Sequence, residues 1–133
     1  MQISSLLIDQ IPTRLPGVSF RAGNTPDAVV VFPAAHPDFG NVEIYDDGDE
    51  LTVYVGNFTH SHFSNYSDAS DAEKAKEIVD STISFLSDIF KDHLVFWGSH
   101  NSRGGGLRRD ELPNPGFSTK GPLYVWSGPC GDG

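Results

Sequence analysis

The chain has 133 residues, of which 38% are hydrophobic, so it is long and apolar enough to bury a hydrophobic core. Its formal net charge of −9 argues against diffuse binding to nucleic acid, because that mode needs many lysine and arginine side chains to replace the counterions of the phosphates. The same charge would repel an anionic membrane surface, and no apolar run reaches the length of about 18 residues that predicts a membrane span.

Two further features favour a cytoplasmic location. The single cysteine, Cys130, excludes an internal disulfide and suits a reducing compartment. Residues 1–8 lack the basic start and the small-residue cleavage site of a secretory signal peptide. We therefore expect a cytoplasmic protein.

The N-terminal part predicts three short elements. Four apolar residues recur at helical spacing: Ile3, Leu6, Leu7 and Ile11. They predict a short helix or an extended arm that Pro12 stops, because proline removes a backbone donor and clashes with the preceding turn. Residues 18–21 predict a short strand, and the continuous apolar run 28–32 predicts a strand covered on both faces.

A β-hairpin is predicted over residues 42–55. Residues 42–45 and 51–55 each alternate between the two faces of a strand, which is the pattern of a half-buried hairpin. The acidic segment 46–50 joins them, and its Gly48 supplies the positive φ that a tight turn needs. Residues 38–50 contain six carboxylates and no lysine or arginine, the densest charge in the chain.

A long amphipathic helix is predicted from Ser70 onward. Ser70 and Glu73 fit a capping box, in which the serine side chain accepts a hydrogen bond from the glutamate backbone N–H. Seven apolar residues follow at helical spacing: Ala75, Ile78, Val79, Ile83, Leu86, Ile89 and Phe90. Burying five or six of the large side chains at about 1.5–3 kcal/mol each would make this face the main stabiliser of the fold.

Beyond the helix the sequence predicts two more strands, 94–97 and 122–126, separated by polar loops that include 98–109. Residues from about 127 predict a flexible C-terminal tail, because they are rich in glycine. Strands that follow one another without helical crossovers predict an α+β fold, a mostly antiparallel sheet of about five or six strands with one long helix on one face. We expect residues 1–133 to form a single domain.

The first candidate site consists of His60 and His62. Residues i and i+2 of a strand project from the same face, so two imidazoles could bind one divalent metal. A catalytic metal needs a third ligand, which could come from His36, His93, His100 or a carboxylate of the hairpin turn. The alternative is that both histidines are half-exposed residues of an ordinary strand, and we expect no cofactor.

The second candidate site is the glycine-rich segment 103–109. It holds three of the nine lysine and arginine residues: Arg103, Arg108 and Arg109. Consecutive glycine N–H groups and arginine forks can bind an anion. No Gly-Lys-Ser/Thr pattern is present, so the segment is not a P-loop, and the alternative is a surface hairpin whose arginines neutralise neighbouring acids.

The third candidate site is the hairpin turn. Its four carboxylates are those of Asp46, Asp47, Asp49 and Glu50. Their spacing differs from that of a calcium-binding EF-hand loop. A tight turn does not require so many like charges for its structure. A basic protein partner would relieve their mutual repulsion.

The sequence lacks a pattern that fixes a reaction. Cys130 lies in a glycine-rich segment with nothing to activate a thiolate, and no serine stands in a Gly-x-Ser-x-Gly context. We therefore interpret the chain as a small acidic non-enzymatic protein-binding domain. Its most specific form is an inhibitor or immunity-type protein that masks a basic site on a toxin or nuclease. A metal-dependent enzyme or metal-binding protein using His60 and His62 is the alternative, and anion or ligand binding at 103–109 is a further one.

Overall fold

The computed structural model describes residues 3–23, 28–48, 50–56, 58–65, 67–99, 102–108 and 122–132. Within these ranges the chain forms two helices and nine strands. Their bounds are α1 Ile3–Arg14, β1 Arg21–Ala22, β2 Ala28–Phe32, β3 Val42–Asp46, β4 Glu50–Val55, β5 Thr59–Ser64, α2 Asp71–Phe90, β6 Leu94–Ser99, β7 Ser102–Arg108, β8 Pro122–Val125 and β9 Gly128–Asp132.

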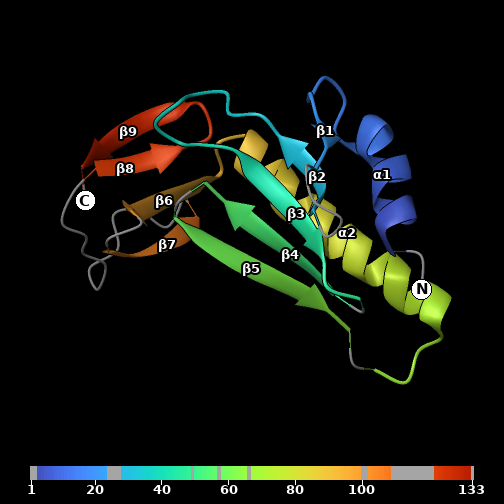
Figure 1. Cartoon of the computed structure of the whole chain (residues 1–133). Helices are drawn as coiled ribbons and strands as arrows, with labels where there is room; N and C mark the ends of the chain where they lie inside the picture. Colours follow the sequence, from blue (N-terminus) through green and yellow to red (C-terminus); the bar gives the residue numbers. More distant parts are fainter. Residues whose placement is uncertain are drawn as a thin grey trace.

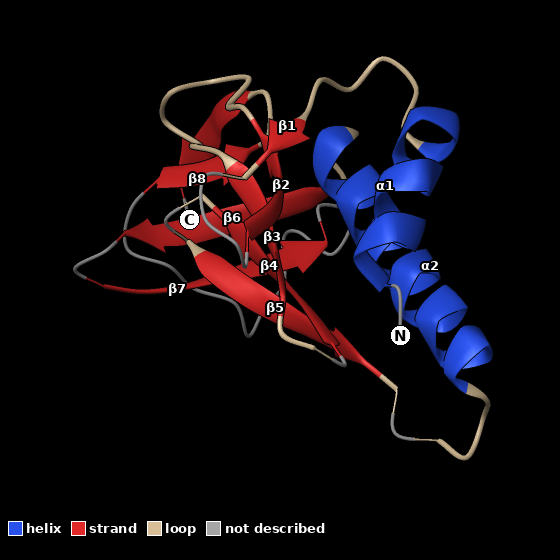
Figure 2. Cartoon of the chain, turned by 45° about the vertical axis from the view of Figure 1, so that its right-hand side comes forward, coloured by secondary structure: helices blue, strands red, loops and turns tan. Residues whose placement is uncertain are grey.

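The first sheet is an antiparallel meander with strand order β1-β2-β3-β4-β5. Both helices lie on one side of it, and Figure 1 looks onto the opposite side, with α2 behind the strands. Figure 2 shows the helices and the strands as separate layers. The predicted α+β fold, with a mostly antiparallel sheet and one long helix on one face, is confirmed. The described helices are not long and apolar enough to cross a membrane.

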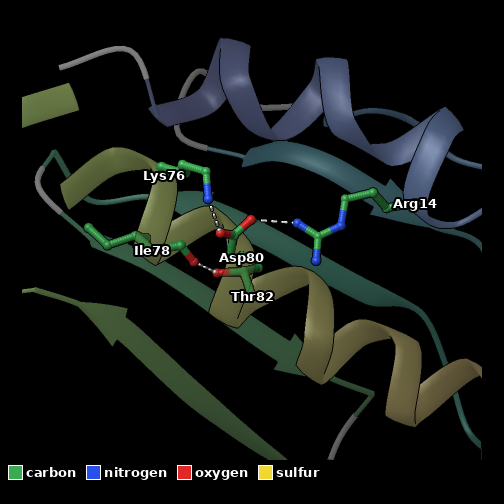
Figure 3. Close-up of polar contacts among 5 residues, drawn as sticks. All are labelled: Arg14, Lys76, Ile78, Asp80 and Thr82. Atoms are coloured by element: carbon green, nitrogen blue, oxygen red, sulfur yellow. Dashed lines mark hydrogen bonds and ion pairs between the residues drawn. The ribbon is translucent and has the colours of Figure 1, made fainter. Parts of the chain in front are cut away.

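The helix α2 packs its apolar side into the core under the sheet. Ser70 is its N-cap, and its hydroxyl accepts a hydrogen bond from the backbone N–H of Glu73 at 3.3 Å, as the capping pattern predicts. Seven residues of the helix are buried: Ala75, Ile78, Val79, Thr82, Ile83, Leu86 and Ile89. The buried Thr82 hydroxyl donates to the carbonyl of Ile78 at 2.8 Å, so this polar group costs little inside the core (Figure 3).

The helix α1 is longer than its proline suggests. It runs to Arg14 with Pro12 inside it, and the N–H of Leu15 still donates to the carbonyl of Ile11 at 2.8 Å. The expected stop at Pro12 is therefore wrong. Proline removes a single donor near the end of the helix, and the burial of α1 against α2 outweighs that loss.

An ion-pair network joins the two helices on their outer side. The Asp80 carboxylate of α2 accepts from Arg14 of α1 and from Lys76 Nζ at 3.0 Å (Figure 3). The hydrogen bond from Lys76, followed by that from Arg14, holds the pKa of Asp80 below its ordinary value although partial burial opposes the shift. These charges are partly exposed, so the network adds only modestly to the packing of α1 on α2.

A second antiparallel sheet, with strand order β7-β6-β8-β9, was not predicted. The segment 98–109, predicted as a loop, supplies β7, which pairs with β6. A glycine allows this pairing, because a Cβ atom at Gly106 would lie 2.7 Å from the ring of Phe96 on the neighbouring strand. Residues 128–132, predicted as a loose tail, form β9 and pair with β8.

The two sheets meet through aromatic rings. Phe39 and Phe58, from the loops at one end of the first sheet, contact Phe96 of β6, with ring centroids 5.6 and 6.1 Å apart. Trp126 follows β8 and packs on Phe90 at the end of α2, with centroids 4.9 Å apart.

The strand predicted at 18–21 is shorter than expected, since β1 begins at Arg21.

We predict that Leu86→Ala destabilises the chain by about 2–5 kcal/mol, because Leu86 is fully buried in the core and its loss leaves a cavity between α2 and the sheet. Ser84→Ala, at an exposed position of the same helix, is the matched control and should change stability by less than about 0.5 kcal/mol. Urea unfolding measures both variants. A neutral Leu86→Ala would mean that α2 packs through another face.

Candidate functional site

The face of the first sheet opposite the helices carries polar and aromatic side chains on its three strands β3, β4 and β5. The strand register aligns Glu43 with Tyr54 and Tyr54 with His60. It also aligns Tyr45 with Thr52 and Thr52 with His62. Opposed residues in antiparallel strands project from the same face, so these six side chains share one surface. We call this surface the helix-free face.

Four rings form a continuous row across the helix-free face. The ring centroids of Tyr45 and Tyr54 lie 5.2 Å apart, those of Tyr54 and His60 5.3 Å, and those of His60 and His62 5.1 Å. Tyr54 is 43% exposed, so its ring is open to solvent. Such a row offers rigid, amphipathic contact area with few rotatable bonds to immobilise on binding.

Carboxylates border this row of rings. The Tyr45 hydroxyl donates to Glu43 Oε1 at 3.1 Å. This hydrogen bond, followed by burial and by the charge of Glu43, raises the pKa of Tyr45 above its ordinary value, because each of them disfavours the phenolate. The strands β3, β4 and β5 contain no lysine or arginine, so the helix-free face between them is acidic.

A shallow hollow lies beside the two tyrosines. It has a volume of about 350 Å³ and is lined by Asn41, Glu43, Tyr45, Tyr54 and Gly56. Asn41 Oδ1 accepts from the backbone N–H of Ala34 at 2.8 Å, which fixes the amide at the rim. Glu43 is the carboxylate among these lining residues, so the negative charge of the hollow comes from Glu43.

A second polar group on this face centres on the buried hydroxyl of Thr52. The hydroxyl donates to the Asp47 carboxylate, and its oxygen lies 2.9 Å from His62 Nδ1. Because the hydroxyl proton goes to Asp47, the oxygen accepts from His62, and Nδ1 carries the proton in this arrangement. Glu50 Oε1 lies 3.3 Å from the same nitrogen.

The two histidines that were predicted to bind one metal therefore have different partners in the structure. The ligand atoms of Asp47, Glu50 and His62 all lie within 4.8 Å of one another, whereas His60 does not belong to this group. A hairpin carboxylate was one of the predicted sources of a third ligand. The structure brings two such carboxylates to His62, and His60 stacks on Tyr54 instead.

The other predicted ligands lie elsewhere. His36 Nδ1 accepts from the backbone N–H of Asp38 at 3.1 Å, and His93 Nδ1 lies 3.2 Å from Asp88 Oδ1. His100 lies outside the described residues.

The carboxylates of the hairpin turn make contacts within the fold that the sequence did not predict. Asp46 faces the helix side, where it accepts from the Ser4 hydroxyl of α1, and its other oxygen accepts from the N–H of Gly48 at 2.8 Å. Asp47 and Glu50 face Thr52 and His62, as described above. The expectation that these charges have little structural role is wrong for Asp46, Asp47 and Glu50, while Asp49 lies outside the described residues.

The arginine-rich segment is described only in part. Arg108 lies at the end of β7, and its Nη1 is 3.4 Å from Asp88 Oδ2. A pocket of about 420 Å³ between β5, α2 and the β6–β7 pair includes Arg108, Thr59, Ser61 and Phe85 in its lining. The side chain of Arg103 and all of Arg109 lie outside the described residues, as does the side chain of Cys130, so anion binding here stays a prediction.

Three residues of this face, Glu43, Tyr45 and Tyr54, were not predicted as site residues from the sequence. Strand alternation already placed Tyr54 on the face opposite Leu51, Val53 and Val55. Alternation does not determine the strand register, which places Tyr54 between Glu43 and His60.

Comparisons of this chain with protein-family models, with curated proteins and with solved structures found no match.

We predict that Glu43→Gln lowers the pKa of Tyr45 towards its ordinary value, because a neutral amide no longer disfavours the phenolate. Titration of the tyrosine ring resonances by NMR, assigned with Tyr45→Phe, measures the change. Glu77→Gln, on the exposed side of α2, is the control and should leave this pKa unchanged. A Tyr45 pKa that is the same in Glu43→Gln and in the wild type would contradict the described hydrogen bond.

Proposed function

We propose that this chain is a non-enzymatic, cytoplasmic, acidic protein-binding domain that binds a basic partner protein through its helix-free face. Its most specific form would be an inhibitor or immunity-type protein that masks a basic site on a toxin or nuclease. The observation that carries the proposal is the row of rings of Tyr45, Tyr54, His60 and His62, bordered by the carboxylates of Glu43 and Glu50 on strands without lysine or arginine.

The chemistry of this face suits a cationic surface. Tyrosine is enriched among the residues that contribute most binding energy at protein interfaces. Exposed aromatic faces attract lysine and arginine by about 0.5–1 kcal/mol each, and more when water is excluded. Carboxylates at the border of such a patch favour a basic partner over an acidic one and speed its association.

The hairpin contributes unequally to the proposed surface. Asp47 and Glu50 lie on the helix-free face beside His62, so they would supply charge at one edge of the interface. Asp46 instead turns towards Ser4 of α1. We therefore assign the acidic contribution of the hairpin to Asp47 and Glu50, and we expect Asp46→Asn to affect stability more than binding.

The test is a capture experiment with immobilised protein and a lysate of the source cell, followed by binding kinetics on the captured partner. The double variant Tyr54→Ala with His60→Ala should weaken binding by at least about tenfold, because it removes the centre of the row of rings. The matched control is Glu73→Gln with Glu77→Gln, which removes two charges from the exposed side of α2 and should bind as the wild type does.

Salt dependence is the second readout of that experiment. The association rate should fall as salt rises, because the Debye length shrinks from about 10 Å at 0.1 M to about 3 Å at 1 M. Binding that is equal in the wild type and in the helix-free face variant, or a captured partner that is acidic, would overturn the proposal.

A second candidate, divalent metal binding, is favoured by the convergence of Asp47, Glu50 and His62. The 3.3 Å between His62 Nδ1 and Glu50 Oε1 matches the edge of about 3.3–3.4 Å between two ligands of a tetrahedral zinc ion. The metal would have to displace the proton on Nδ1 and draw Asp47 inward. A metal bound by these three residues would leave a fourth position open, which is the arrangement of a catalytic site.

Titration calorimetry with zinc chloride tests this second candidate. If these three residues bind zinc, the wild type gives a saturable one-site isotherm that His62→Gln abolishes and His60→Gln preserves. His60 is the matched control because it lies two residues away on the same face but outside the ligand group. Absence of saturable binding, or equal loss in both variants, would reject this ligand set.

A further inference from the structure

The hollow lined by Asn41, Glu43, Tyr45, Tyr54 and Gly56 stands out on the helix-free face because it combines a carboxylate with two tyrosine rings. Its volume of about 350 Å³ lies at the low end of the range of about 300–1,000 Å³ that is usual for ligand sites. A hollow of this size suits a single long side chain of a partner rather than a whole cofactor.

Glu43 has hydrogen-bonding capacity to spare. In the described part of the chain, the Tyr45 hydroxyl is the side-chain partner of its carboxylate, and it contacts Oε1 alone. An ionised carboxylate offers about four lone-pair sites, so one hydrogen bond leaves most of them for a ligand. The same hydrogen bond fixes the carboxylate in place, which lowers the entropy lost when a donor binds.

The ring of Tyr54 forms one side of the hollow. Glu43 and His60 pair with Tyr54 from opposite neighbouring strands, so they flank it on opposite sides. His60 packs on Tyr54 at an interplanar angle of 31°, whereas the ring of Tyr45 meets it at 76°. The two tyrosine rings thus stand nearly perpendicular to each other next to the Glu43 carboxylate.

We infer that this hollow binds one arginine side chain of the basic partner, with the guanidinium donating to Glu43 and lying against Tyr54. This inference rests on the proposed function, and it adds the chemical group that the helix-free face recognises.

Guanidinium is planar, donates two parallel hydrogen bonds to a carboxylate and stacks on aromatic rings, so it can satisfy both features of the hollow at once. A lysine ammonium is a compact, strongly hydrated charge without this planar fork. We therefore expect arginine to bind better than lysine.

The probe for this test is the peptide acetyl-Gly-Arg-Gly-amide, titrated against the wild-type chain and followed by NMR. Its citrulline counterpart keeps the shape of arginine but has no charge, and its lysine counterpart keeps the charge but has no fork. The arginine peptide should shift the resonances of Glu43, Tyr45 and Tyr54 in a saturable way. The lysine peptide should bind more weakly, and the citrulline peptide should produce no saturable shift.

Two variants localise the binding. Glu43→Gln keeps the size of the side chain and should weaken the arginine peptide by about tenfold, the effect of losing one charge-assisted pair. Glu73→Gln on α2 removes the same charge far from the hollow and should leave the affinity unchanged. Thermal unfolding of both variants verifies that they are folded.

The outcomes separate this inference from the proposed function. Equal binding of the arginine and citrulline peptides, or an unchanged affinity in Glu43→Gln, overturns the arginine site even if the Tyr54→Ala, His60→Ala variant still loses the partner. Saturable arginine binding at Glu43 together with undiminished partner capture by that double variant would overturn the proposed function and remove the basis for assigning the arginine to the partner.

Discussion

The structure depends on the burial of one face of a five-stranded sheet under two helices. Side chains alternate along each strand, so covering one face with α1 and α2 forces every second residue of β3, β4 and β5 onto the other face. On the covered face the alternate residues are apolar and buried, as at Ile44 and Val53. Apart from the buried Thr52, the residues that define the helix-free face keep contact with solvent.

Hydrogen bonds connect several side chains of the helix-free face to one another. The hydroxyl of Thr52 joins Asp47 to His62, and the hydroxyl of Tyr45 holds Glu43. These contacts hold Glu43 and His62 on strands and Asp47 in the hairpin turn. A substitution such as Thr52→Val would remove the hydroxyl that joins Asp47 to His62.

Sequence patterns identified the parts of the fold whose signals are local. The hairpin over 42–55 and the capped helix from Ser70 follow from alternation, turn chemistry and helical spacing, and both are confirmed. The second sheet was not predicted because β7 contains consecutive glycines, which normally mark loops. Its pairing depends on Phe96 packing over Gly106, a contact between residues ten positions apart that no local pattern records. The strand β9 was missed for a similar reason, since it is held by pairing with β8 rather than by its own composition.

The candidate site was only partly accessible to the same reasoning. Residue spacing pointed to His62 and the hairpin carboxylates, and among these Asp47, Glu50 and His62 meet in space. It also placed Asp46 with them, yet strand alternation turns that carboxylate to the helix side, where it accepts from Ser4. The row of rings needs the register of three strands, which composition and spacing do not determine.

Hydroxyl-radical footprinting of the chain in complex with its captured basic partner tests the central claim most directly. If the helix-free face is the binding surface, Tyr45, Tyr54 and His60 become protected in the complex, while the exposed side of α2 around Glu73 and Glu77 keeps its reactivity. Protection confined to α2, with the three rings as reactive as in the unbound chain, would contradict the account.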